Sequence, residues 1–210
     1  MRRLPVTILT LLLSTLFITT TANAQLLQFG IKGGLNMTDF TGVDYDSETR
    51  NGGHLGLSLT LNPPLLPLGV ESGLYYTQKG ARFMATDPDL GEMEFTYKMD
   101  YLEVPVLAKL DILPVGPVRP HILAGPWVGF AVNSESELSI DNISATEDMS
   151  DFTRPVDMGL LLGVGSDFNI GIARLSLQLR YSLGLTPALE DEFDEGEKNR
   201  ALYLTVGYGF

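Results

Sequence analysis

The stretch "LSLQLRYSLGLT", residues 175–186, alternates strictly between apolar and other side chains. One parity carries Leu175, Leu177, Leu179, Tyr181, Leu183 and Leu185, and the other carries Ser176, Gln178, Arg180, Ser182, Gly184 and Thr186. Period-two alternation is typical of a β-strand, because successive side chains point to opposite faces. The stretch exceeds the roughly 5–6 residues usual for a soluble strand and matches the roughly 9–11 of a tilted membrane-spanning strand.

The same alternation recurs along the chain and predicts eight strands, at 27–40, 54–62, 68–84, 94–111, 119–132, 156–168, 172–186 and 200–210. The links 63–67, 112–118 and 169–171 are short and built on Pro, Gly or Asn. The links 41–53, 85–93, 133–155 and 187–199 are mostly longer and acidic. Short turns at one end and long loops at the other are typical of an outer-membrane barrel. We therefore predict an all-β, eight-stranded antiparallel up-and-down transmembrane β-barrel over residues 25–210.

A soluble barrel would also alternate, so the chemistry of the two faces has to distinguish the two architectures. The outer face of a soluble barrel would carry Lys and Glu, with its large apolar side chains inside. Here the face opposite the apolar one is mostly Gly, Ser, Thr and Asn, with few charges. Such a face suits a narrow, crowded lumen, which favours the membrane barrel.

The first 24 residues have the pattern of an export signal. Arg2 and Arg3 form a basic start, an apolar stretch follows, and "ANA" at 22–24 supplies the small residues that precede a cleavage site. We predict a signal peptide over 1–24 that is cleaved after Ala24; the alternative is an uncleaved N-terminal anchor. Cleavage would take the formal charge from −12 to −14.

Composition narrows the classes of partner and cofactor. So acidic a chain repels nucleic-acid phosphates, which excludes nucleic acid as a partner. The chain contains no Cys, which excludes disulfides, thiolate nucleophiles and Cys-ligated metals. The acidic runs 87–94 and 190–197 are rich in oxygen ligands but lack the spacing of a calcium loop, so solvated loops are the favoured interpretation. No cofactor or metal is predicted.

Within the segment 94–111 the apolar parity changes. Phe95, Tyr97, Met99 and Tyr101 are odd-numbered, whereas Leu102, Val104, Val106, Ala108 and Leu110 are even-numbered. A β-bulge near Asp100–Tyr101 would switch the faces of this strand. Alternatively the first half of the strand stands above the bilayer, where both faces can be mixed, and this second interpretation is the favoured one.

Charged residues on the small-residue face are predicted to lie in the lumen. The set comprises Lys32, Glu71, Lys79, Glu103, Lys109, Arg119, Asp157, Asp167, Arg174 and Arg180. The central candidates are Glu71, Glu103, Lys109 and Arg180. Glu71 and Lys109 are predicted at one depth of the barrel, and Glu103 and Arg180 at another. Paired charges that plug the lumen are favoured over a gated pore, because eight strands leave little open bore.

Several segments, in order along 25–210, resemble the PorT-like outer-membrane β-barrel domain family of Bacteroidetes-type Gram-negative bacteria. They are "FGIKGGLNMTDF" (29–40), "GLYYTQKGARF" (73–83), "YLEVPVLAKL" (101–110), "PHILAGPWVGF" (120–130), "LGVGSDF" (162–168), "LRYSLGLTPA" (179–188) and "VGYGF" (206–210). Glu103, Pro105 and Lys109 occupy the characteristic positions of the family's strand motif, aromatic-L-E-[IV]-P-x-L-x-K. The resemblance implies an eight-stranded barrel without shared catalytic residues. The family's namesake is linked to protein secretion, a role that fold likeness alone does not transfer.

The end of the sequence, "LYLTVGYGF" (202–210), is similar to the C-terminal signal read by the outer-membrane barrel-assembly machinery. Apolar residues stand at alternate positions before a final aromatic residue: Leu202, Leu204, Val206, Tyr208 and Phe210. This segment must also pair with the first strand to remove both sheet edges.

The function predicted from the sequence is non-enzymatic: an integral outer-membrane barrel with a structural or partner-binding role in the cell envelope. Its expected partners are outer-membrane lipid and lipopolysaccharide, the assembly machinery, and an extracellular or envelope protein held by the loops 41–53, 85–93, 133–155 and 187–199. A narrow pore or a transport- or secretion-associated barrel is the alternative. A lipid-modifying enzyme built on His54, Ser58 and an acidic loop residue is the least favoured one.

Overall fold

The computed structural model describes residues 26–41, 47–63, 66–87, 91–112, 116–140, 143–150, 153–171, 173–187 and 198–210. The predicted signal peptide and the acidic run 190–197 lie outside these residues. Within the described residues, no helix is long and apolar enough to cross a membrane.

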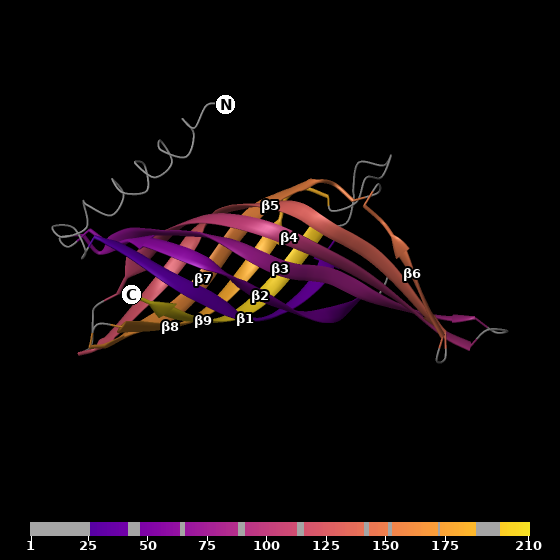
Figure 1. Cartoon of the computed structure of the whole chain (residues 1–210), viewed down its shortest axis with the longest axis horizontal. Helices are drawn as coiled ribbons and strands as arrows, with labels where there is room; N and C mark the ends of the chain where they lie inside the picture. The colour runs from indigo at the N-terminus through magenta and orange to yellow at the C-terminus, as the bar shows by residue number, and fades with distance from the viewer. Residues whose placement is uncertain are drawn as a thin grey trace, which may run out of the picture.

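The fold is a single antiparallel sheet that closes on itself (Figure 1). Its strands are β1 (Leu27–Thr41), β2 (Ser47–Leu61), β3 (Leu68–Asp87), β4 (Gly91–Asp111), β5 (Val118–Ile140), β6 (Ile143–Asp148), β7 (Val156–Ile170), β8 (Ala173–Gly184) and β9 (Lys198–Gly209). The neighbours run β4-β3-β2-β1-β9-β8-β7-β5, and β4 pairs with β5 to close the ring. Eight strands therefore form the barrel, as predicted, and β6 lies outside the ring as an added strand on β5.

The closure joins the two ends of the sequence. β9 pairs with β1 from Gly30 opposite Gly209 to Thr41 opposite Lys198, and with β8 on its other side. The start of β1 and the end of β9 lie at the same end of the barrel (Figure 1). The described parts of the short links also lie there, and two of them turn on glycines with left-handed backbone, Gly116 (φ 61°) and Gly171 (φ 64°).

Side chains alternate between the lumen and the outside of the barrel along every strand of the ring. On β9 the outward residues are those of the predicted assembly signal, and all five are at least 41% exposed. Ala201, Tyr203, Thr205 and Gly207, which alternate with them, are buried. The outward belt is made of apolar residues such as Leu35, Leu57 and Leu162, and the interior holds most of the buried polar and charged side chains. This inside-out polarity is that of a barrel surrounded by hydrocarbon.

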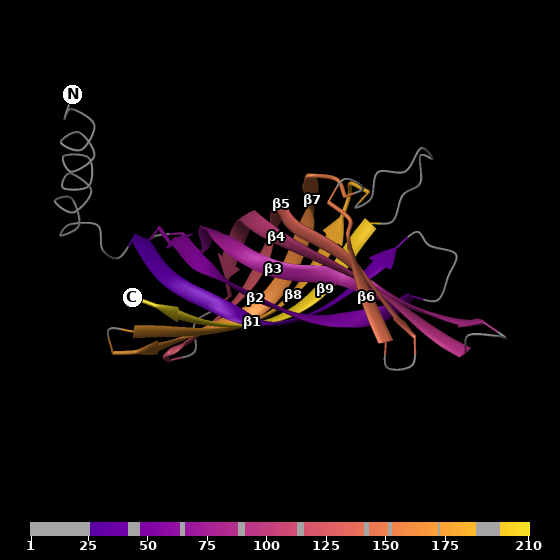
Figure 2. The same cartoon turned by 45° about the vertical axis from the view of Figure 1, so that its right-hand side comes forward.

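Three strands are much longer than a membrane crossing requires and continue beyond the rim of the barrel. β3, β4 and β5 contain 20, 21 and 23 residues, and β6 pairs with the far end of β5 from Glu135 opposite Asp148 to Ile140 opposite Ile143. The four strands project to one side as a curved ribbon (Figure 2). The segment 133–155, predicted as a loop, is therefore largely strand. Likewise, the predicted loop 41–53 contains the start of β2, and the predicted loop 85–93 contains the end of β3 and the start of β4.

These loop predictions were wrong because the sequence of the extra strand segments gives no apolar alternation. "SESELSI" (134–140) reads as a polar loop. It becomes a strand because it pairs with the first half of β4, Met93 with Ile140 through Met99 with Ser134. A neighbouring strand can impose β structure on a segment whose own composition does not favour it.

A bulge marks the point where the ribbon leaves the barrel. The register between β4 and β5 shifts between Asp100 and Tyr101, as one interpretation of the sequence predicts, but the extra residue belongs to β5. In β4 odd-numbered residues stay on the inner side, with both Met99 and Tyr101 buried. In β5 the buried positions change from odd (Gly129) to even (Ser134). The less favoured interpretation, in which β4 itself switches faces, is therefore wrong. The first half of β4 instead continues beyond the rim of the barrel, in line with the favoured interpretation.

Candidate functional site: the charged lumen

The interior of the barrel is arranged in layers along its axis. A charged layer lies toward the short-turn end, a second charged layer lies toward the opposite end, and apolar and aromatic side chains lie between and above them. These residues occupy every second position of each strand, so the alternation of the sequence directs their side chains into the lumen.

The lower charged layer centres on Glu71 of β3. Its Oε2 lies 2.6 Å from Nζ of Lys32, and its Oε1 accepts a hydrogen bond from Nη2 of Arg180 at 2.6 Å. Gln178 of β8 also donates to Glu71 (3.2 Å) and lies 3.2 Å from the ring of His121. All five side chains are buried. One carboxylate thus neutralises cations that reach it from two other strands.

A second ion pair completes the lower layer at the short-turn end. The ammonium group of Lys109 bonds the carboxylate of Asp167, and Arg174 approaches the same carboxylate to 3.8 Å. Lys109 also lies 3.9 Å from Asp111. Glu71 and Lys109, which the sequence placed at similar depth, therefore lie in the same layer but take different partners.

The upper charged layer is built around Lys79 of β3, which is completely buried. Its Nζ lies 2.6 Å from Glu103 and 3.8 Å from Asp157. Thr77 donates to Glu103 (2.9 Å), while Asn199 and Thr186 donate to Asp157 (2.9 and 2.8 Å). These hydrogen bonds supply the partners that buried carboxylates require.

Apolar and aromatic side chains fill the space beside these layers. Leu107, Leu123, Trp127 and Leu161 form one buried cluster. The ring of Trp127 lies 3.7 Å from Nζ of Lys79, a cation–π contact that ties this cluster to the upper layer. Toward the rim, Phe40, Ala81, Met99 and Tyr101 form a second cluster, with Phe83, Tyr97 and Ala131 packed against it.

Little free space remains between these layers. The cavity among His54, Tyr75, Glu103, Trp127 and Arg180 measures about 20 Å³, and a second cavity at the short-turn end, lined by Lys32, Glu71, Lys109, Asp167 and Arg174 among others, is also about 20 Å³. A volume of this size holds about one water molecule. An eight-stranded ring is just wide enough for its own side chains, which is what the described lumen shows.

The four central residues predicted from the sequence are all buried in the lumen, but they do not form the pairs suggested by depth. Glu71 joins Arg180 rather than Lys109, and Glu103 joins Lys79 rather than Arg180. Of the wider predicted set, Arg119 is exposed and Arg174 is half-buried. The pairing differs because strand tilt brings residues of different sequence depth to one level.

Several neutral residues of the lumen were not predicted from the sequence. His121 and Gln178 link the two ion pairs of the lower layer, and Tyr75 stacks on the Arg180 guanidinium with 5.7 Å between the cation and the ring centre. Each of them alternates with outward apolar residues in β3, β5 or β8, so its inward position could have been predicted from the sequence. They were not predicted because only charged residues were taken as signs of a buried network.

His54, the candidate histidine of an enzymatic site, is also buried in the lumen. Its Nε2 lies 2.9 Å from Oγ1 of Thr205, and its ring packs edge-on against Tyr203 at 5.2 Å. Ser58 lies four residues further along the same strand, roughly 13 Å away at strand rise. A histidine at that distance cannot activate the serine hydroxyl directly.

Comparison with known proteins agrees with this architecture. Neisserial surface protein A is 12% identical, with 87% of this chain and 95% of that chain covered and a TM-score of 0.50. A second similar structure is a major outer membrane protein from Thermus thermophilus, which is 16% identical, with 88% of this chain and 98% of that chain covered and a TM-score of 0.49. A third is OprG from Pseudomonas aeruginosa, which is 14% identical, with 87% of this chain and 95% of that chain covered and a TM-score of 0.48. At such identities the likeness concerns the fold alone. No curated protein matches the sequence.

The family comparison covers most of the chain. The model described as outer membrane protein beta-barrel domain matches residues 23–190. This range contains β1 to β8, both charged layers of the lumen and the strand motif at 101–110. Together with the closed ring and its lipid-type outer belt, the match establishes both family and location: the chain is an outer-membrane protein and belongs to the outer membrane protein β-barrel domain family.

Proposed function

We propose that this protein is a closed, non-enzymatic barrel whose role is structural or partner-binding and is exercised at the end opposite the short turns. The observation that carries the proposal is the filled lumen. The lumen holds two layers of paired charges, the cluster around Trp127 and the cluster around Tyr101, and the cavities between these side chains measure about 20 Å³. A barrel packed in this way is a rigid platform for the ribbon above it, and long structured segments on a rigid scaffold are typical of binding surfaces.

Ion conductance of the refolded barrel, residues 25–210, in a planar bilayer tests the closed lumen. We expect no discrete conductance steps from a sample whose heat-shifted gel band shows that it has folded. Discrete steps would overturn the closed barrel and support the alternative of a narrow pore or transport-associated barrel. Glu103, Lys109 and Arg180 would then be the first residues to mutate as selectivity elements.

Absence of enzymatic activity on lipid needs its own test. The buried contacts of His54 with Thr205 and Tyr203 support a packing role for this histidine. We expect His54→Ala to leave the lipid A species of the host unchanged in mass spectra. A changed species would support the lipid-modifying alternative. Thr205→Ala, which removes the same hydrogen bond but keeps the imidazole, is the matched control.

The narrower assignment to the PorT-like family is also proposed. It is supported by the motif "YLEVPVLAKL" (101–110) and by the order of the other matching segments. Glu103, Pro105 and Lys109 of this motif all point into the lumen, where Glu103 and Lys109 anchor the two charged layers. A role for the motif in packing the lumen fits a family without shared catalytic residues.

A further inference from the structure

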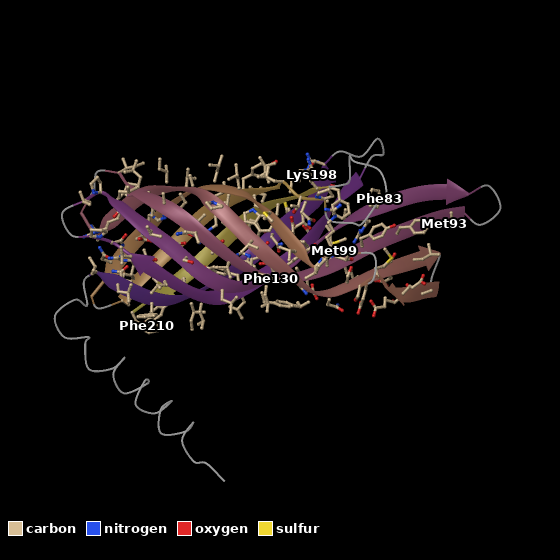
Figure 3. All side chains as sticks on the ribbon, turned by 90° about the horizontal axis from the view of Figure 1, so that it is seen from above. Phe83, Met93, Met99, Phe130, Lys198 and Phe210 are labelled. Carbon is tan, nitrogen blue, oxygen red and sulfur yellow. The ribbon has the colours of Figure 1, made fainter. Side chains whose placement is uncertain are left out.

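The ribbon beyond the rim, here called the extension, consists of residues 81–87, 91–100, 133–140 and 143–148. It is made of the β3–β4 hairpin and the β5–β6 hairpin side by side. Met93 lies at its far end, while Phe210 lies at the opposite end of the molecule (Figure 3). The extension is the part of the described protein that reaches furthest from the barrel.

One face of the extension carries its apolar side chains, together with Ser136 and Glu147, which stand opposite Tyr97. Phe83, Phe95, Leu138 and Ala145 stand directly opposite one another across the four strands and therefore share a face. Met93 and Tyr97 lie on the same face of β4. Close to the rim this face is buried by the cluster around Tyr101. Further out, Met93, Phe95 and Leu138 are half-buried, and no second layer of described strands covers them.

The opposite face is charged. Arg82 lies 3.0 Å from Glu94, and Lys98 bonds Glu137. In the whole segments 81–100 and 133–150 the sequence contains ten Asp or Glu residues and two Lys or Arg residues. The extension is thus an amphipathic sheet with a strong excess of negative charge, and its apolar side is turned the opposite way from that of the barrel below.

The outer side of β6 is an open edge. Among the described strands, β6 pairs with β5 alone. Ser144, Ala145, Thr146, Glu147 and Asp148 are all exposed, whichever face they point to. An open edge presents unpaired backbone groups and invites pairing with another strand. Glu147 and Asp148 disfavour a second copy of the same acidic strand, because like charges would then face each other.

We propose that the β6 edge binds an extended segment of a partner protein in which basic and apolar residues alternate. The proposal rests on the partner-binding role given above and names the surface and the partner chemistry. The backbone of the added strand would pair with β6. Its apolar side chains would continue the face of Leu138 and Ala145, and its basic side chains would approach Asp148 and the charged face. Strand addition explains why the edge, the apolar face and the acidic excess occur together.

Fluorescence anisotropy with the whole refolded barrel tests this proposal. The barrel is held in phosphatidylcholine nanodiscs, whose headgroups carry no net charge to attract the probe. The probe is a labelled, end-blocked peptide of about seven residues alternating Lys and Val, the length that a short edge strand can pair with. A peptide of the same composition with all Lys residues at one end is the control for simple charge attraction. We expect the alternating peptide to bind at least about tenfold more tightly than the block peptide, a difference of about 1.4 kcal/mol.

Variants of the extension locate the site. Leu138→Ser removes an apolar neighbour of the edge, and Asp148→Asn removes a charge from it. Each is expected to weaken binding of the alternating peptide by roughly two- to fivefold. Asp148→Asn loses one cross-strand pair, and Leu138→Ser loses the apolar side chain that stands beside the small Ala145 and extends toward the added strand. Val132→Ser, on the same strand but outside the apolar face, and Asp111→Asn, at the opposite end of the barrel, are matched controls and should leave binding unchanged.

The outcomes separate this proposal from the closed-barrel function. Equal binding of the two peptides, or no binding of either, would overturn strand addition at β6. Preferential binding that neither Leu138→Ser nor Asp148→Asn weakens would place the site elsewhere and would also overturn it. None of these results depends on conductance. A barrel that shows no conductance steps and binds neither peptide would therefore overturn strand addition but still support the closed-barrel function.

Discussion

The carboxylate of Glu71 on β3 lies 2.6 Å from the guanidinium group of Arg180 on β8, across the lumen. β2, β1 and β9 separate these two strands along the wall of the barrel. Because Lys32 on β1 contacts the same carboxylate, one acidic side chain ties three strands together through the interior. The contact cross-links the sheet in a direction that its own backbone hydrogen bonds do not follow.

Glu71→Gln should destabilise the barrel by about 3–5 kcal/mol, because it leaves two buried cations beside a neutral partner. Urea unfolding of the refolded barrel in detergent micelles measures this change. Glu94→Gln is the matched control. The side chains of Glu94 and Arg82 are 35% and 39% exposed, so the loss should be below about 1 kcal/mol. Equal losses for the two variants would contradict the bracing role of Glu71.

Gly34 should be required for closure of the barrel between β1 and β9. A Cβ atom at this position would lie 1.9 Å from the carbonyl oxygen of Leu204 on the neighbouring strand. Gly34→Ala must therefore push the two strands apart, at a cost of roughly 1–3 kcal/mol or more. We expect a smaller folded fraction, seen as a weaker heat-shifted band.

Gly53 provides the comparison for Gly34. A Cβ atom there would meet its nearest neighbour at 3.6 Å, an ordinary contact. Gly53→Ala should fold like the original protein. If both variants fold equally well, the close approach of β1 and β9 is not limiting.

The Lys98–Glu137 contact should make part of the extension sensitive to acid. The hydrogen bond from Lys98 lowers the pKa of Glu137 below its usual value of 4.5. A lowered pKa in the folded state means that this contact adds stability above the usual pKa and loses it as the pH falls through the lowered one. An NMR titration should find the low pKa in the original protein and a value near 4.5 after Lys98→Met. An unchanged pKa in that variant would exclude Lys98 as the cause.

Phe210 is expected to matter for assembly more than for the fold. Its N–H donates to the carbonyl oxygen of Phe29, and the residue is 70% exposed on the outside of the barrel. Phe210→Ala keeps the backbone hydrogen bond and removes the ring that the proposed assembly signal presents. We expect much less folded barrel in the membrane of cells but normal refolding in detergent. Normal cellular levels would count against the signal, and Phe210→Tyr should restore them.

The alternation of the sequence predicts the wall of the barrel well, because hydrocarbon outside and a crowded lumen inside impose opposite polarities on each strand. Parity alone predicts that alternate residues from Leu202 to Phe210 point outward. It also predicts that Leu161 points inward despite its apolar neighbours. Parity does not predict the partners inside. Whether Glu71 meets Lys109 or Arg180 depends on tilt and stagger, which period-two patterns do not contain.

The outer parts of the extension, within 85–93 and 133–148, were missed as strands for a different reason. Outside the bilayer, water can satisfy the backbone, so the sequence no longer has to alternate apolar and polar residues. "SESELSI" therefore carries no strand pattern of its own, and its pairing with β4 between Met93 and Met99 is a long-range property. The change of apolar parity at Asp100–Tyr101 marks this boundary. The favoured interpretation placed the first half of the predicted strand 94–111 above the bilayer, and the register shift found there puts its extra residue on β5.

The pairing of β1 with β9 has a consequence for the order of events during folding. Thr41 and Lys198 stand opposite each other although they lie near opposite ends of the chain, so the ring cannot close before β9 is available. Contacts between such distant segments require a large loss of chain entropy and form slowly. Until then β1 and β8 each keep an unpaired side, and the nascent sheet needs shelter from aggregation in the envelope. By pairing with both, β9 removes these two unpaired sides.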